Sequence, residues 1–204
     1  MTRKEFDNLD DSIKSFELIK ILSEEKWKNI EHLSSEFGGK RIKGLKWKKG
    51  LTESEIEDFE KQLGFKFPDA LKNFYRVMNG LAIIDENFTK EKDYPFYQKL
   101  YRSYPDDINL IKENTDFELK SFNISKEDIL SKKVPMIFNY CGNRYLILDD
   151  NRQVLSIRGD AIFYGKNLSK GLSKDIFNDF MDTKKEHLLK YKFVNGWLEK
   201  KYWS

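Results

Sequence analysis

The sequence predicts an α+β fold in which helices precede and follow an antiparallel sheet of about four to six strands. Three observations predict it. Apolar residues recur at helical spacing through much of the first 80 residues. Four short strand-like segments separated by turn residues then lie between residues 135 and 165, and helical spacing returns from Leu168. Helices, a block of hairpin-connected strands and a closing helix are the order expected of an α+β domain.

The segment from about 12 to 37 carries an apolar face at helical spacing, and Gly38-Gly39 ends it. This pattern predicts one or two N-terminal helices. If there are two, Ser23 caps the second. The apolar positions are Ile13, Phe16, Ile19, Leu22, Ile30 and Leu33.

A capping box marks the next helix. Thr52 and Glu55 stand three residues apart, so the hydroxyl can accept from a free backbone N–H while the carboxylate reaches back to the cap. Ile56, Phe59 and Leu63 then fall on one face, and Gly64 can adopt the left-handed conformation that closes a helix. A helix over 53–63 is predicted.

A second short helix follows directly. Pro68 suits a first helical position because its ring fixes φ and its missing N–H needs no partner there. Asn79-Gly80 is expected to stop this helix. The apolar face consists of Leu71, Phe74, Tyr75 and Met78.

The second half is expected to be mainly β structure. Residues 81–84 read as a strand, 85–133 form a mixed segment with an edge strand at 108–111, and Pro135 begins a four-stranded antiparallel meander. Cys141 lies in the first tight turn of this meander. A last helix begins near Leu168 and uses Leu172, Ile176, Phe177, Phe180 and Met181, followed by a tail with Trp197 and Trp203.

Composition fits one globular domain over residues 1–204. The chain has 204 residues, of which 39% are hydrophobic and 15% aromatic, enough for a core, while 35% are charged and the mean hydropathy is −0.70. No stretch reaches the ~20 uncharged residues of a membrane span. The N-terminus also lacks the apolar segment of a secretory signal, so we expect a soluble, cytoplasmic protein that does not bind membranes.

Metal and cofactor sites are not expected. The one cysteine, Cys141, excludes an intramolecular disulfide, and together with His32 and His187 it cannot supply a zinc cage. Neither histidine is linked by sequence to a nucleophile, and no nucleotide-binding loop is present. Asp106-Asp107 and Asp149-Asp150 are read as turn residues. A hydrolase, or a metal site made of carboxylates alone, would require such carboxylates to converge in a pocket.

Charge is concentrated in one block. Residues 41–50 contain five basic and no acidic residues, although the chain's net charge is only +3. With Trp47 in the middle, the block could attract phosphate and stack bases, which gives the alternative function of a nucleic-acid-binding or regulatory adaptor using residues 40–49. The competing interpretation is a solvated edge around one buried tryptophan. Counted from Lys40, the basic residues of 40–49 are Lys40, Arg41, Lys43, Lys46, Lys48 and Lys49.

The run from Trp47 to Gly80 resembles the signature of the SUKH superfamily of bacterial immunity proteins and related fungal Smi/Knr-type cell-wall assembly regulators. The matching positions are Trp47, Ile56, Glu60, Leu63, Gly64, Pro68, Phe74, Asn79 and Gly80. The later strands and closing helix are similar to the second half of that family. The resemblance covers about residues 40–182, with an N-terminal helical extension at 1–39 and a C-terminal tail at 183–204.

The resemblance implies a protein that is not an enzyme and that binds and neutralises a cognate toxin domain, without a cofactor and with no nucleic acid as partner. The basic block would suit an acidic surface on such a toxin. Glu60, near the buried face of its helix, is expected to accept hydrogen bonds from neighbouring backbone or from Trp47. The candidate contact residues are Lys46, Trp47, Lys48, Asp85, Glu86, Tyr94, Tyr97 and Tyr101. The tyrosines among them could equally be core residues.

Overall fold

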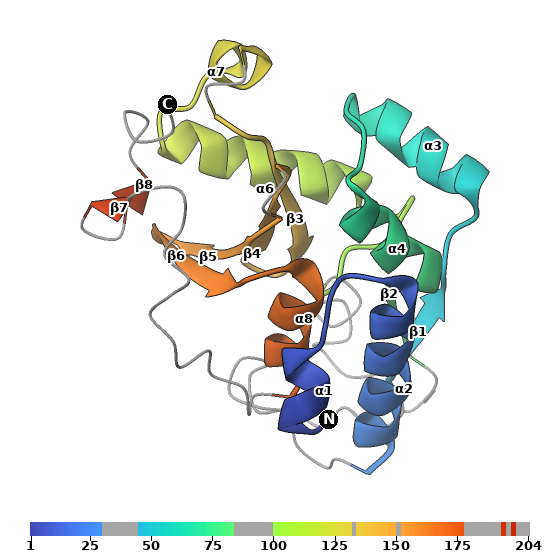
Figure 1. Ribbon diagram of the computed structural model, residues 1–204. Coiled ribbons are helices and arrows are strands. Elements are labelled where there is room, and N and C mark those ends of the chain that lie inside the picture. Colours follow the sequence, from blue (N-terminus) through green and yellow to red (C-terminus); the bar gives the residue numbers. More distant parts are fainter. Residues whose placement is uncertain are drawn as a thin grey trace.

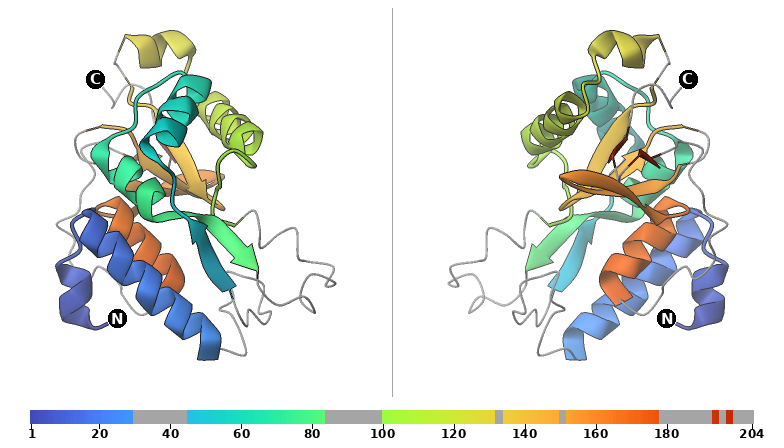
Figure 2. Two further views of the ribbon diagram at one scale, coloured as in Figure 1. Left: turned by 90° about the vertical axis from the view of Figure 1, so that its right-hand side faces the viewer. Right: turned by 90° about the vertical axis from the view of Figure 1, so that its left-hand side faces the viewer.

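The computed structural model describes residues 1–29, 45–83, 100–131, 134–149, 152–177, 193–194 and 197–198. These form an α+β fold, as the sequence predicts (Figure 1). A four-stranded antiparallel sheet has α6 on one face and α8 on the other, and α1 and α2 lie beside α8 (Figure 2). No helix among the described residues combines the length and apolar character needed to cross a membrane.

The N-terminal helices are α1 (Arg3–Asp7) and α2 (Ile13–Asn29). The sequence pattern did not indicate α1. Of the two alternatives, the break at Ser23 is wrong, because α2 is one helix that continues through this residue. Its buried hydroxyl donates to the Lys20 carbonyl at 2.9 Å and accepts from Trp47 Nε1 at 2.8 Å. Ser23 therefore joins α2 to β1 rather than capping a helix. Residues 30–44 lie outside the described part.

The signature segment forms β1 (Leu45–Lys49), α3 (Glu53–Leu63), α4 (Asp69–Val77) and β2 (Met78–Ile83), and β1 pairs antiparallel with β2. The predicted bounds of α3, its capping box and the left-handed Gly64 at φ 82° are confirmed. Pro68 is the N-cap of α4, one position earlier than expected. That helix ends at Val77, so Asn79-Gly80 lies inside β2 rather than at the helix end.

The middle segment forms α6 (Ile108–Ser121) and α7 (Lys126–Leu130). The edge strand predicted at 108–111 is wrong. Ile111, Thr115 and Leu119 are buried on one face of α6, so the run Ile108–Ile111 is the first turn of a longer helical pattern. This helix covers the sheet face that carries Tyr145, and the cluster between them includes Leu119 and Phe122.

The meander predicted from Pro135 onward is confirmed. It consists of β3 (Ile137–Cys141), β4 (Arg144–Ile147), β5 (Val154–Arg158) and β6 (Asp160–Gly165), in the order β3-β4-β5-β6. Cys141 is the last residue of β3 rather than a residue of the tight turn, and it is 4% exposed. Two short strands, β7 (Phe193–Val194) and β8 (Trp197–Leu198), form a separate hairpin in the region expected to be a tail.

The closing helix α8 (Leu168–Phe177) begins where the sequence predicts. Phe180, Met181 and Trp203 lie outside the described residues. Two glycines let α8 approach the sheet closely. A Cβ on Gly171 would lie 2.9 Å from Val154 Cγ2, and one on Gly165 would lie 2.8 Å from Gly171 Cα. This close approach brings the end of α8 to the sheet, where the pocket described below is found.

Candidate functional site

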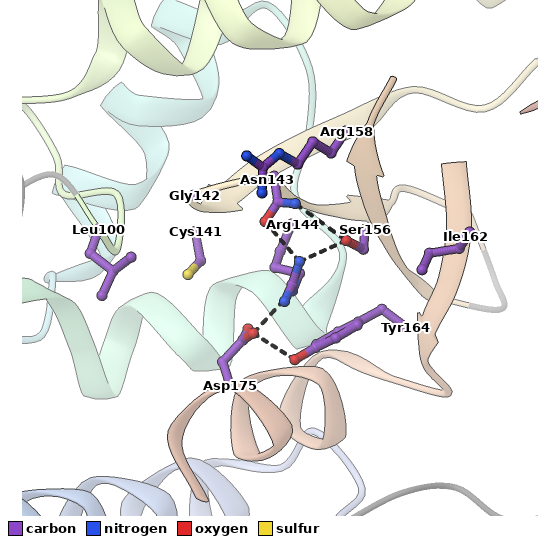
Figure 3. Close-up of a pocket in the computed structure, with 10 residues that line it drawn as sticks. All are labelled: Leu100, Cys141, Gly142, Asn143, Arg144, Ser156, Arg158, Ile162, Tyr164 and Asp175. Carbon is purple, nitrogen blue, oxygen red and sulfur yellow. Dashed lines mark hydrogen bonds and ion pairs between the residues drawn. The ribbon is translucent and has the colours of Figure 1, made fainter. Parts of the chain in front are cut away.

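A pocket of about 630 Å³ lies where the β3–β4 hairpin, the second half of β5, the paired part of β6 and the last turn of α8 meet (Figure 3). The walls combine charged, polar and apolar side chains from parts of the chain that are far apart in sequence. The lining residues are Leu100, Cys141, Gly142, Asn143, Arg144, Ser156, Arg158, Ile162, Tyr164 and Asp175.

The floor of the pocket is a buried ion pair held by hydrogen bonds. Arg144 Nε lies 3.0 Å from Asp175 Oδ1, and both side chains are at most 9% exposed. The Tyr164 hydroxyl donates to the same carboxylate oxygen at 2.7 Å, and the Arg144 guanidinium lies 3.8 Å from the centre of the Tyr164 ring. Arg144 NH1 also donates at 2.7 Å to Ser156 Oγ and to Asn143 Oδ1. The guanidinium is therefore fixed from several sides.

Strand register places these side chains on one face of the sheet. Arg144 pairs with Ser156, and Ser156 pairs with Ile162, so the three residues form a row across β4, β5 and β6. Tyr164 lies two residues beyond Ile162 and faces the same way because strand side chains alternate. The close packing of α8 on the sheet brings Asp175 to the end of this row.

The electrostatics of the floor favour the charged form of Arg144. Burial alone would lower the pKa of Arg144, but Asp175 and Tyr164 raise it, and the net effect holds it above the ordinary arginine value. Burying the two charges costs desolvation energy, but the hydrogen bonds around them hold both side chains in a fixed geometry. The floor is thus a rigid polar surface of nearly balanced charge.

The rim differs from the floor. Arg158 is exposed, and Ile162 is 49% exposed although it is a large apolar side chain. Leu100 and Cys141 form the opposite wall. A concave site with apolar walls, a few fixed polar groups and an open rim is suited to receiving a side chain or a small ligand. No cluster of three or more metal-binding His, Cys, Asp or Glu side chains occurs within the described ranges.

The basic block has only its C-terminal part in the described residues. Lys46 and Lys49 are exposed on β1, whereas Lys48 pairs with Asp106 at 2.9 Å. Trp47 is 5% exposed and its ring lies 4.7 Å from that of Tyr101. In this conformation the tryptophan is a core residue and offers no stacking surface, which removes the aromatic half of the nucleic-acid hypothesis. Lys40, Arg41 and Lys43 lie outside the described part.

The other proposed contact residues are not brought together on a described surface. Tyr101 is fully buried, so its side chain cannot reach a partner in this conformation. Its neighbour Leu100 lines the pocket. Asp85, Glu86, Tyr94 and Tyr97 fall in 84–99, outside the described residues.

Glu60 has the structural surroundings that the sequence suggests. It is 2% exposed, and Oε1 accepts from the Phe67 N–H at 2.7 Å. Oε2 accepts from Lys66 Nζ at 2.7 Å, and Lys72 Nζ lies 3.2 Å from Oε1. The predicted backbone hydrogen bond is therefore present, whereas the indole of Trp47 donates to Ser23 instead. Glu60 fixes the link between α3 and α4.

The remaining signature residues also have structural contacts. Asn79 forms a two-way pair with the backbone of Tyr104: Nδ2 donates to its carbonyl, and Oδ1 accepts from its N–H, both at 2.7 Å. Gly80 has φ 73°, and a Cβ there would lie 2.6 Å from Ser103 Cβ. Phe74 is fully buried, and Leu63 packs partly buried against the same cluster. These residues anchor β2 and α3 to the residues that precede α6.

A second hollow of about 460 Å³ lies between the end of α3, α6 and α7. Its apolar residues include the half-buried Phe65 and Ile129, and Leu130 is 81% exposed at its edge. Lys112 and Lys126 stand at the same hollow. It contains none of the residues singled out from the sequence, apart from Leu63 and Gly64 of the signature.

Sequence reasoning missed the pocket floor. The sequence patterns singled out none of Arg144, Tyr164 and Asp175. The sequence did contain a signal for the buried pair, since a charged residue falls on the core face of a strand and another on the core face of a helix. In the strand Arg144–Ile147, alternation puts Arg144 on the same face as Leu146, and in α8 Asp175 stands beside Leu172 and Ile176 on the buried face. Two opposite charges on core faces predict a buried pair.

Comparisons with known proteins give one family. No curated protein and no solved structure matches the chain. The sequence model of the SMI1 / KNR4 family (SUKH-1) matches residues 50–185, which is two thirds of the chain and includes most of the signature segment, the meander and α8. The chain therefore belongs to the SMI1 / KNR4 family (SUKH-1).

Proposed function

We propose that this protein is an immunity protein, which binds a cognate bacterial toxin domain and neutralises it by protein–protein interaction. The observation that carries the proposal is the family match over residues 50–185, because membership in SUKH-1 supports an immunity-type role and a protein as partner. Neutralisation would be stoichiometric: the bound protein covers the active site of the toxin or blocks its assembly.

The pocket and its rim are the contact surface that we propose. A partner gains most from a few well-packed anchors at a preorganised site, since little conformational entropy is then lost on binding. The fixed Arg144–Asp175 floor and the exposed Ile162 rim supply such a site. The exposed lysines Lys46 and Lys49 would add long-range attraction for an acidic toxin surface.

Co-expression tests the proposal. A large protein with a variable C-terminal domain encoded beside this gene would supply the toxin candidate, and that domain would be expressed from an inducible promoter with and without this chain. We expect the chain to restore growth and to co-purify with that domain. Failure to restore growth and to form a complex would contradict the proposed function.

A pair of matched variants tests the surface. Ile162→Asp places a charge on the pocket rim, and Phe117→Asp places one on α6, where Phe117 is 68% exposed. We expect Ile162→Asp to abolish rescue and Phe117→Asp to retain it, with both variants folded by circular dichroism. Equal rescue by both would exclude the pocket rim as the contact surface.

A further inference from the structure

We propose that the pocket above Arg144 receives an acidic side chain, Asp or Glu, of the protein partner, and that Arg158 is the residue that selects its charge. The inference rests on the proposed function in one respect, because it assigns the carboxylate to a protein partner. The binding chemistry itself depends only on the pocket, so it can be tested without that partner.

The first argument is the position of Arg158. It is the last residue of β5, it is exposed, and its guanidinium forms no hydrogen bond or ion pair with the side chains that the structure describes. Figure 3 shows Arg158 and Asp175 at opposite ends of the pocket. A carboxylate that enters at the Arg158 end therefore meets an available guanidinium before it approaches the buried acid.

The second argument is the charge of the lining residues. Arg144 and Asp175 neutralise each other at 3.0 Å, so the pocket keeps one positive charge, that of Arg158. Arginine presents a planar fork of donors that matches the two oxygens of a carboxylate. An ion pair in a partly enclosed site is also screened less by water and salt than one on an open surface.

The third argument is the apolar wall on each side. Leu100 and Ile162 face the space from opposite walls, and the Tyr164 ring lies next to Ile162 (Figure 3). These groups can pack against the methylene groups of an Asp or Glu side chain while its carboxylate reaches Arg158. A free inorganic anion has no such apolar part, so the pocket is expected to prefer a side chain.

The experiment is a titration of the full chain followed by heteronuclear NMR. The probes are glutamate with both backbone ends blocked, the equally blocked glutamine as its uncharged isostere, and inorganic phosphate. We expect blocked glutamate to shift the Arg158 Nε–H and the Ser156 and Ile162 amide signals in a saturable way. Blocked glutamine should produce no saturable shift.

Variants identify the residue responsible. Arg158→Gln should weaken binding of blocked glutamate by about tenfold, as expected for loss of one charge-assisted hydrogen bond. Arg158→Lys should recover part of the affinity because it keeps the charge. Lys126→Gln, which removes an exposed charge on α7, should leave the titration unchanged.

Four outcomes would overturn the inference. They are the absence of saturable shifts with blocked glutamate, equal shifts with blocked glutamine, tighter binding of phosphate than of blocked glutamate, and unchanged binding in Arg158→Gln. Asp160 stands opposite Arg158 in the strand register, so Asp160→Asn is a further check. Binding in Asp160→Asn alone would be a case of the first outcome, because the natural chain would then show no saturable shift. None of these results depends on the toxin, so a failed co-expression test and a failed titration are distinguishable.

Discussion

The buried pair Arg144–Asp175 is the residue-scale feature on which the pocket depends. Each charge is withdrawn from water and is compensated by the other, so removal of one partner leaves an uncompensated buried charge. The same pair orients Tyr164 through its hydroxyl. Loss of the pair should therefore affect stability and pocket shape together.

Asp175→Asn should lower the free energy of unfolding by about 3–5 kcal/mol, because it leaves Arg144 charged and buried. Unfolding in urea, monitored by tryptophan fluorescence, measures this loss of free energy. The double variant Arg144→Met/Asp175→Leu should lose less than the single one, since no buried charge remains. The control is Asp7→Asn, which removes the exposed partner of Arg3 and should cost below about 1 kcal/mol. Similar losses in Asp175→Asn and Asp7→Asn would contradict this account.

Glu60 gives the fold a predictable pH dependence. Burial raises its pKa, but the Lys66 ammonium, the Phe67 N–H and the Lys72 ammonium outweigh burial and hold the pKa below the ordinary value of 4.5. A carboxyl with a lower pKa in the folded chain stabilises the fold above its unfolded pKa. That contribution disappears as the pH falls through the folded value.

Glu60→Gln should therefore reduce stability at pH 7, by about 1–3 kcal/mol, because Gln cannot satisfy two ammonium groups and an N–H equally well. On acidification below 4.5 the natural chain should lose more stability than the variant, so their unfolding midpoints should converge. Urea unfolding at a series of pH values measures this. Glu57→Gln, an exposed acid on the same helix, is the control. Parallel pH curves for the natural chain and Glu60→Gln would argue against the role of Glu60.

At the scale of elements, α8 depends on the N-terminal segment for its first turn. Asp11 accepts from the N–H of Ser169 at 2.6 Å and from the N–H of Leu168 at 3.2 Å. Asn167 accepts from the N–H of Lys170 at 3.0 Å. Residues that precede the matched family segment thus complete a helix inside it. Since α8 carries Asp175, the N-terminal segment indirectly supports the pocket.

Asp11→Gly tests this link. Asp11 has φ 63°, a conformation that Gly adopts without strain, so the variant removes the two hydrogen bonds and little else. We expect a loss of about 1–2 kcal/mol, as for other helix caps, and faster amide hydrogen exchange in the first turn of α8. Asp10→Gly is the control, because within the described part of the chain the Asp10 side chain bonds to Ser12 and Ser15 and not to α8. Unchanged exchange at Leu168 and Ser169 would contradict the link.

For the whole molecule, local sequence signals predicted the helices and strands better than they predicted the contacts between them. The Thr52–Glu55 capping box and Gly64 determined α3 because each acts within one turn. The run 108–111 was misread because four residues fit both a strand and a helix turn, and only the continuation to Thr115 and Leu119 separates the two.

The pocket was harder to predict than the fold because it depends on pairing between distant residues. Arg144 and Asp175 are 31 positions apart, and their contact follows from the close approach of Gly171 and Gly165. Trp47 was expected either as a contact residue or as a buried side chain. The indole is buried and donates a hydrogen bond to Ser23, a residue that the sequence offered only as a possible helix cap.

The most direct test of the central claim is a titration of the toxin domain's own activity with this purified chain. A protein that acts by occupying its partner should reduce activity linearly, reaching zero at one molecule per toxin molecule, and both chains should be recovered unchanged from the complex. Loss of toxin activity at far below one equivalent, with a chemically altered toxin, would contradict the claim and indicate an enzyme.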